Sequence, residues 1–429
     1  MQVIKEYVQR WYESGLDPDE YICHRKQGNL VEIEEADTGR RRMVLTFCTN
    51  DVLGLVQSPA VKQAAIDAIL QFGTSNSSTS VLSGRIDLHR QLEDEISAFK
   101  HLGHTQLFLN AWMAMQALMD AFCHQAIPVP GFQNTRETLI MTDVLNHGCI
   151  VSAIANAGTR SGKLFGHSPA VRVRAYRHCD MEDFARKLKR YAKPGDRILV
   201  VSDAVFSMDG DIAPLPDMID IMSKYEDTTL VMDEAHASGS IGATGRGIYE
   251  HFGILPQDAL DKGVTPLIMT TFSKFGASVG AAISSPVAEL KPLLNVSPSS
   301  IGTCSLAPPL TAAALEAVRQ VRQHPELVQR LHDNMRYLRN RLAENDFLAI
   351  GETNVLPVLL PPDLNPKDFA RSLVANHGIW VSPIWYIAKP RLRITANALH
   401  TREEMDRLVA AMVAVREEMS YKPAATISA

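Results

Sequence analysis

The chain has 429 residues, of which 46% are hydrophobic and 21% charged, and its formal net charge is −5. This composition predicts a globular protein with a large core, and the length favours two or three domains. The small negative charge argues against a nucleic acid or an anionic membrane as partner. No segment approaches the ~18 apolar residues of a membrane span. The start lacks a signal peptide's apolar core and the six cysteines show no paired spacing, so we expect a cytoplasmic protein with reduced thiols and no metal site.

The first 290 residues predict an arm followed by a large domain. Residues 1–48 form the arm, with a helical start, Arg40–Arg42 in a solvated turn, and a strand over 44–48. From residue 49 to about 290, helical and strand-like segments alternate. Helices are expected over 60–72, 88–100 and 111–122, and strands over 105–109, 139–142, 171–175, 197–202, 229–233 and 267–271. This alternation predicts an α/β fold with a mostly parallel central sheet and helices on both faces.

The remaining residues, 291–429, predict a smaller α+β domain. A strongly helical stretch covers 310–345, strands are expected over 356–360 and 391–395, and a final helix covers 402–419. Within the large domain, residues 126–137 contain Pro128, Pro130 and Gly131 and predict an exposed loop.

Residues 230–236, Leu-Val-Met-Asp-Glu-Ala-His, carry the strongest chemical signal in the chain. The apolar run predicts a buried parallel strand that places Asp233 at its carboxyl end, the edge of an open α/β sheet where ligands bind. Lys274 follows the strand expected over 267–271, where partial desolvation makes an amine a usable nucleophile. An aspartate facing a pyridine nitrogen and a lysine Schiff base are the standard protein contributions to pyridoxal phosphate chemistry. We therefore predict that Asp233 and Lys274 hold this cofactor.

Other polar residues follow predicted strands, each with a structural alternative. His147 is typical of a hydrogen-bonding histidine or of a ring stacked on a cofactor. Ala111 and Trp112 open a helix, where free backbone N–H groups can bind a phosphate. Arg391 and Arg393 alternate on a short strand, so both should point to one face, as a surface strand or as a clamp on a carboxylate.

Several longer motifs make the chain resemble a known family over residues 49 to about 408. They are Thr49-Asn50-Asp51-x-Leu53-Gly54-Leu55, Asp143-x-x-Asn146-His147, the run 205–215 with Ser207-Met208-Asp209-Gly210-Asp211, Asp233-Glu234-Ala235-His236-Ala237-Ser238-Gly239, Thr271-Phe272-Ser273-Lys274 and Arg391-Leu392-Arg393-Ile394-Thr395. In this order they resemble the α-oxoamine synthase family of fold-type I pyridoxal phosphate enzymes. Trp112 and the run 306–309, Leu-Ala-Pro-Pro, slightly favour the family's autoinducer-synthase branch.

The resemblance implies a role for each matching residue. Lys274 would carry the cofactor and later move the substrate's α-proton, and Asp233 would keep the pyridine nitrogen protonated. His147 would stack on the cofactor ring, and His236 and Ser207 would hydrogen-bond its phenolic oxygen. Ala111, Trp112 and Thr271 would contact the phosphate. Arg393 would bind the amino acid carboxylate, and Asn50 would lie beside the substrate. Thr303 would reach the phosphate site of a partner subunit, because the family builds its site at a homodimer interface.

The reaction implied by the resemblance is a decarboxylative condensation of a small amino acid with an acyl thioester, giving an α-aminoketone. In this reaction His236 would polarise the developing oxyanion. The acyl donor is either a coenzyme A ester or a thioester on an acyl carrier protein. Three alternatives remain open: ligase-type cleavage of an amino-keto acid, an aminotransferase, and a non-catalytic regulatory subunit. The presence of Lys274 argues against the last of these.

Overall fold

A seven-stranded sheet forms the centre of the computed structural model, which describes residues 1–13, 21–123, 136–159, 170–385 and 389–420. The strand order is β4–β10–β9–β8–β7–β5–β6. The strands are β4 (His104–Phe108), β5 (Thr138–Asp143), β6 (Val171–Tyr176), β7 (Arg197–Asp203), β8 (Thr228–Asp233), β9 (Val264–Thr271) and β10 (Ala281–Ser285). β10 is antiparallel to both neighbours, and the other pairs are parallel. The predicted α/β fold with a mostly parallel sheet is therefore confirmed.

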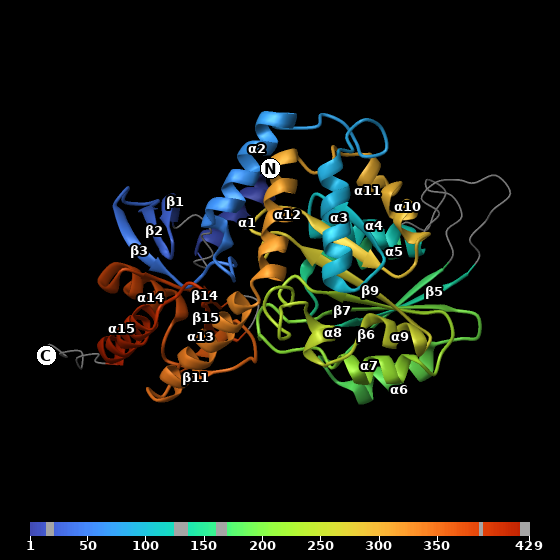
Figure 1. Cartoon of the computed structure of the whole chain (residues 1–429). Helices are drawn as coiled ribbons and strands as arrows, with labels where there is room; N and C mark the ends of the chain where they lie inside the picture. The colour runs from blue at the N-terminus through green and yellow to red at the C-terminus, as the bar shows by residue number, and fades with distance from the viewer. Residues whose placement is uncertain (14–20, 124–135, 160–169, 386–388, 421–429) are drawn as a thin grey trace, which may run out of the picture.

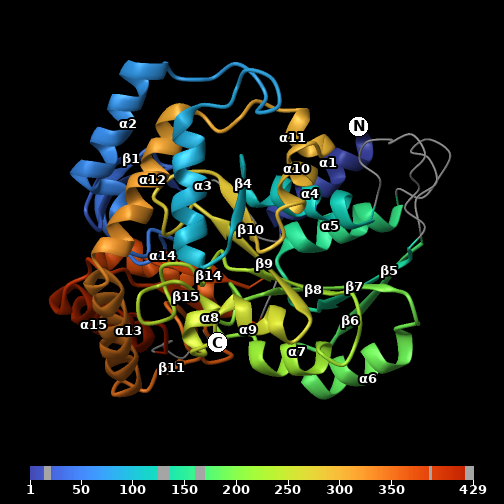
Figure 2. The ribbon, with the colours of Figure 1, turned by 45° about the vertical axis from the view of Figure 1, so that its right-hand side comes forward.

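Helices cover both faces of this sheet. Val200 and Met232 belong to the core beneath α6 (Met181–Tyr191) and α7 (Leu215–Met222), together with α8 (Ile248–His251) and α9 (Pro256–Asp261). Val201 and Val231 belong to the opposite core beneath α4 (Ala111–Cys123) and α5 (Gly148–Thr159). Figures 1 and 2 show α4 and α5 on one side of the sheet and α6 and α7 on the other. Burial on both faces explains why these strands are uniformly apolar.

Helices also connect the large sheet to the C-terminal part. They are α2 (Pro59–Phe72), α3 (Asp87–Lys100), α10 (Leu290–Asn295), α11 (Pro298–Ile301), α12 (Pro308–Gln323) and α13 (Glu326–Ala343). The single helical stretch expected over 310–345 is thus two helices. The break falls at His324-Pro325, where the proline lacks the N–H of a continuing helix and restricts the residue before it.

The C-terminal part contains a second sheet, an antiparallel one in the order β11–β12–β15–β14. Its strands are β11 (Leu348–Ala349), β12 (Val355–Leu359), β14 (Ser382–Ile384) and β15 (Arg391–Thr395), and it is covered by α14 (Pro366–Ser372) and α15 (Arg402–Ser420). In Figure 1 this part lies beside the large sheet, with α13 and α15 next to each other. Its mixed composition agrees with the predicted α+β character.

The N-terminal residues form a third sheet that the sequence did not predict. After α1 (Gln2–Glu13), strands β1 (Tyr21–Gln27), β2 (Leu30–Glu35) and β3 (Arg41–Thr46) pair antiparallel, and β13 (Ile379–Trp380) adds a parallel strand from the C-terminal part. The expected solvated turn at Arg40–Arg42 is wrong for two of its residues, which lie in β3. Arg41 pairs with Glu34 at 2.8 Å and Arg42 with Glu35 at 2.6 Å across the β2–β3 ladder. Cross-strand ion pairs of this kind favour the strand over a turn.

The predicted loop over 126–137 and the expectation about membrane spans can each be compared with the structure only over the described residues. The loop predicted over 126–137 lies outside them up to residue 135. Within the described ranges, no helix is long and apolar enough to cross a membrane.

Candidate active site

Most of the predicted site residues line one cavity at the carboxyl edge of the large sheet. Its volume is about 310 Å³. The lining includes Asn50, Ala111, Trp112, His147, Ser207, Asp233, His236, Thr271 and Lys274. These nine residues come from six different segments of the chain, and all but Asn50 follow strands of the large sheet, whose carboxyl ends meet at one edge.

Asp233 ends β8 and is 3% exposed. Its Oδ1 accepts a hydrogen bond from the backbone N–H of Ala235 at 2.9 Å, and its Oδ2 lies 3.8 Å from the Cys149 thiol. Burial raises the pKa of Asp233, whereas Lys274, the Ala235 backbone and His147 act to lower it. A buried carboxylate with a donor and two basic groups beside it can face a pyridinium nitrogen.

Lys274 lies in the turn after β9, as predicted. Burial lowers the pKa of its amine, and the charge of Asp233 acts in the opposite direction. The turn is tightly built: the Phe272 N–H donates to the Gly280 carbonyl at 2.9 Å, and a Cβ on Gly276 would lie 2.8 Å from the Phe272 Cα. The amine is therefore held in the cavity in a state that favours its neutral, nucleophilic form.

Two histidines face the same cavity in neutral states. Burial and the charge of Lys274 lower the pKa of His236 well below its usual value. Burial also lowers the pKa of His147, whose Nδ1 accepts a hydrogen bond from the Cys149 N–H at 3.2 Å. This bond places the ring proton of His147 on Nε2. The His147 ring lies edge-on to Trp112, with 6.4 Å between ring centroids.

Arg391 and Arg393 both contact the turn that carries Ser207, so the prediction that they share one face is confirmed. Arg393 Nε donates to the Ser207 carbonyl at 2.7 Å, and burial lowers the pKa of its guanidinium. Arg391 instead forms an ion pair with Asp209 at 2.6 Å and is 3% exposed. Because Arg391 is already paired with Asp209, Arg393 is the better candidate for a substrate carboxylate.

The start of α4 lies at the same cavity. Asn110 Oδ1 accepts the Met113 N–H at 3.0 Å, and Ala111 and Trp112 line the cavity at the first turn of the helix. The helix dipole and the free N–H groups of a first turn favour a phosphate. Thr271, whose hydroxyl lies 2.9 Å from that of Ser273, lines the same cavity.

Thr303 lies apart from the other predicted residues. It lines a different cavity with Ser80, Arg85 and His89 rather than the one that contains Lys274. Within one chain, the structure therefore does not bring Thr303 to the other predicted residues.

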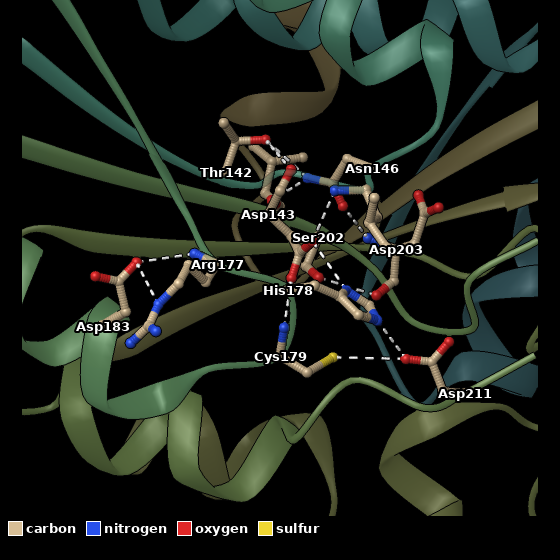
Figure 3. A network of polar contacts seen from close by, with 12 residues as sticks. Thr142, Asp143, Asn146, Arg177, His178, Cys179, Asp183, Ser202, Asp203 and Asp211 are labelled. Carbon is tan, nitrogen blue, oxygen red and sulfur yellow. Dashed lines mark hydrogen bonds and ion pairs between the residues drawn. The ribbon is translucent and has the colours of Figure 1, made fainter. Parts of the chain in front are cut away.

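A polar network beneath the cavity was missed by sequence reasoning. His178 follows β6, and its ring lies between Asp143 at the end of β5 (3.1 Å) and Asp211 in the turn after β7 (2.5 Å), as Figure 3 shows. Burial acts to lower the pKa of His178, but the hydrogen bonds to the two carboxylates raise it to about 12. An imidazolium thus links the turns that carry His147 and Ser207.

Asn146 and Asp203 complete this network. The Asn146 amide donates to Thr142 Oγ1 and to the Val201 carbonyl, each at 2.8 Å, and its oxygen accepts the Asp203 N–H at 2.9 Å. Asp203 ends β7 and lines the cavity. An acid after the apolar run 198–201 is the same signal that identified Asp233, so Asp203 could have been found from the sequence. No local sequence pattern predicts the role of His178.

Comparisons with known proteins agree with this geometry. The family profile for aminotransferases of classes I and II matches residues 42–412. The 8-amino-7-oxononanoate synthase of Fervidobacterium nodosum is 32% identical over 413 residues, which cover 94% of this chain and 95% of that protein. The corresponding enzyme of Symbiobacterium thermophilum is 32% identical over 383 residues, covering 88% and 90%. The chain belongs to the α-oxoamine synthase family of fold-type I pyridoxal phosphate enzymes.

Solved structures share the fold of this family member. The serine palmitoyltransferase of Sphingomonas wittichii superposes with a TM-score of 0.83 at 22% identity, covering 98% of both chains. The 8-amino-7-oxononanoate synthase of Francisella tularensis gives a TM-score of 0.66 at 19% identity, covering 88% of this chain and 99% of that one. At these identities the likeness concerns the fold.

Proposed function

We propose that this α-oxoamine synthase condenses an amino acid with an acyl thioester, releases carbon dioxide and forms an α-aminoketone. The observation that carries the proposal is the placement of Asp233 and Lys274 in one cavity at the carboxyl edge of the sheet. The curated relatives named 8-amino-7-oxononanoate synthase support the same reaction class.

The cavity residues fit pyridoxal phosphate. Lys274 would hold its aldehyde carbon, Asp233 its ring nitrogen, and His147 the face of its ring. Ser207 and His236 are the candidates for its phenolic oxygen, and the start of α4 with Thr271 is the candidate phosphate site. When bound, the cofactor supplies an electron sink for the negative charge that develops at the substrate's α-carbon.

The chain's own groups then have defined tasks. The lowered pKa of Lys274 provides a neutral amine that can accept the α-proton. Arg393, buried beside the Ser207 turn, is the proposed partner of the amino acid carboxylate, since a guanidinium matches a carboxylate in shape and charge. Neutral His236 can donate a hydrogen bond to the oxyanion that forms when the thioester carbonyl is attacked. Asn50, at the cavity wall, is the proposed neighbour of the substrate.

The test compares Lys274→Ala with Lys262→Ala, a lysine that pairs with Asp220 at the surface. Single amino acids are supplied with coenzyme A esters and with carrier-protein thioesters of several chain lengths, and thiol release, carbon dioxide and the aminoketone are measured. We expect Lys274→Ala to lower turnover by roughly 10²–10⁴-fold or more, the range of a lost acid–base group, and Lys262→Ala to leave it unchanged.

Equal turnover of Lys274→Ala and the native enzyme would contradict the proposal. Keto acid formation without thioester consumption would instead identify an aminotransferase.

We further propose a homodimer with shared sites. Large apolar side chains are exposed here: Trp112 (52%) and Val279 (49%) line the cavity, and Val144 (52%) and Leu145 (49%) shortly precede the cavity residue His147 in the chain. Such a patch is typical of a protein interface. A second copy would cover it and could bring its own Thr303 to the phosphate end of the cavity. The thioester assay above distinguishes a coenzyme A ester from a thioester on an acyl carrier protein as the acyl donor.

Two further assignments remain proposals. All six cysteines are free, which favours a reducing compartment such as the cytoplasm. The division of the chain into an arm (1–48), a large domain (49–290) and a small domain (291–429) is supported by the position of the seven-stranded sheet between residues 104 and 285.

A further inference from the structure

Asp203 and Asp233 form a pair of acids, and the proposed reaction gives a role only to Asp233. They are register partners on the neighbouring parallel strands β7 and β8, and both line the cavity. Asp203 is 4% exposed and Asp233 is 3% exposed. Two buried carboxylates side by side repel each other when both are ionised, so one of them holds a proton.

Their hydrogen-bond environments decide which acid is charged. Asp233 accepts the Ala235 N–H and lies near the Cys149 thiol. Asp203 receives a backbone hydrogen bond from His147, but its Oδ1 is buried and has no hydrogen-bond partner among the described residues, and Figure 3 shows this carboxyl group pointing away from His178. An ionised oxygen without a donor is much more costly to bury than a neutral one. The negative charge therefore belongs on Asp233.

The electrostatics of the surrounding groups agree with this assignment. Burial and the negative charge of Asp233 raise the pKa of Asp203 well above its usual range, and Asp143 adds to this effect. The His147 backbone and Lys274 act in the opposite direction without reversing it.

We propose that Asp203 remains a neutral carboxylic acid in the holoenzyme and donates a hydrogen bond to an acceptor oxygen of the ligand in this cavity. The negative charge then stays on Asp233, where a pyridinium nitrogen needs it. The acceptor is an oxygen of the cofactor or of the amino acid, and both offer the same chemistry to a carboxylic acid. The inference rests on the proposed function only for the identity of the ligand.

Protonation is tested first, on the holoenzyme and on the cofactor-free protein, by infrared difference spectroscopy of the native protein against Asp203→Asn. At neutral pH we expect the native protein to show a protonated-carboxyl band that is absent from Asp203→Asn. A native spectrum without such a band, or a band that survives in Asp203→Asn, would overturn the assignment. Because no turnover is measured, a protein that fails to condense its substrates still gives a clear result.

Hydrogen bonding is tested by the dissociation constants of pyridoxal phosphate and of the amino acid, for Asp203→Leu and Asp203→Asn. We expect Asp203→Leu to weaken one of them by about tenfold, equivalent to about 1.4 kcal/mol, and Asp203→Asn to recover most of that loss because its amide is a neutral donor. A loss in the first constant identifies a cofactor oxygen, and a loss confined to the second identifies the amino acid. Equal losses in both variants, or none in either, would refute the donor role.

Discussion

A fully buried ion pair next to the site gives the sharpest stability prediction. Lys100, at the end of α3, and Glu234, directly after Asp233, have side chains that are 0% exposed. Lys100 Nζ donates to the Glu234 carboxylate, to Ser238 Oγ at 2.6 Å and to the Arg246 carbonyl at 2.6 Å, so all three of its protons are used. Burial acts to lower the pKa of this lysine, and Glu234 acts against the shift.

Replacing Lys100 with methionine keeps the apolar stem but leaves Glu234 buried without its cation. Removing one partner of a buried pair costs about 3–5 kcal/mol of the free energy of unfolding, because the remaining charge has no compensation. The Glu234 carboxylate is held in place on two sides. Its Oε1 accepts the Ile248 N–H at 2.9 Å, and Gly247 lies so close that a Cβ there would be 2.2 Å from Oε2. We expect Lys100→Met to fall within that range.

Urea unfolding followed by circular dichroism measures this cost, with the double variant Lys100→Met/Glu234→Gln as the decisive comparison. The glutamine keeps an acceptor for Ile248 but carries no charge, so we expect the double variant to be more stable than Lys100→Met alone. The control Lys262→Met removes an exposed partner of Asp220 and should cost less than about 1 kcal/mol. A cost below about 1 kcal/mol for Lys100→Met, or additive losses in the double variant, would refute the reasoning.

Two further predictions concern histidines. His178→Gln removes the cation between Asp143 and Asp211. We expect it to weaken pyridoxal phosphate binding and to lower the free energy of unfolding by about 2–3 kcal/mol, because hydrogen bonds to charged groups contribute about this much. If neither the binding constant nor the free energy of unfolding changed, the proposed link between the two turns would be contradicted. His400 accepts the Asn397 N–H at 2.9 Å, and burial lowers its pKa from 6.5 to about 4. As the pH falls, the unfolded chain protonates this histidine before the folded protein does. The contribution of neutral His400 to the free energy of unfolding should therefore be fully present above pH 6.5, and about 3 kcal/mol should be lost between pH 6.5 and 4. His400→Gln should remove that part of the pH dependence.

The central sheet was predictable because its signals are local. Apolar runs of three or four residues, separated by helical segments, identify β5, β7, β8 and β9 without any knowledge of what they contact. β10 was missed because Ala281-Ala282-Ile283-Ser284-Ser285 is small and only weakly strand-forming. β1 was missed because six of its seven residues are exposed, so it shows no alternation, and β13 is only two residues long.

The site residues also divide into those that a local sequence signal predicts and those that it does not. Asp233 and Lys274 follow apolar strands and could be predicted from position alone, whereas His178 acquires its role from Asp143 and Asp211, which lie 35 and 33 residues away in the sequence. The buried ion pair of Lys100 could not be predicted either, since a lysine at the end of a helix is normally solvated. Contacts between distant segments therefore decide the charge states on which the chemistry depends.

The two cavity acids show how far a sequence rule reaches. Asp203 and Asp233 each end an apolar strand, and the same rule places both at the ligand edge of the sheet. The rule cannot separate them, because their difference arises from the Ala235 N–H and the Cys149 thiol beside one acid and the unpartnered oxygen of the other. A carboxylate and a carboxylic acid thus occupy equivalent positions on neighbouring strands, and the donors around them assign one to hold a cation and the other to donate a hydrogen bond.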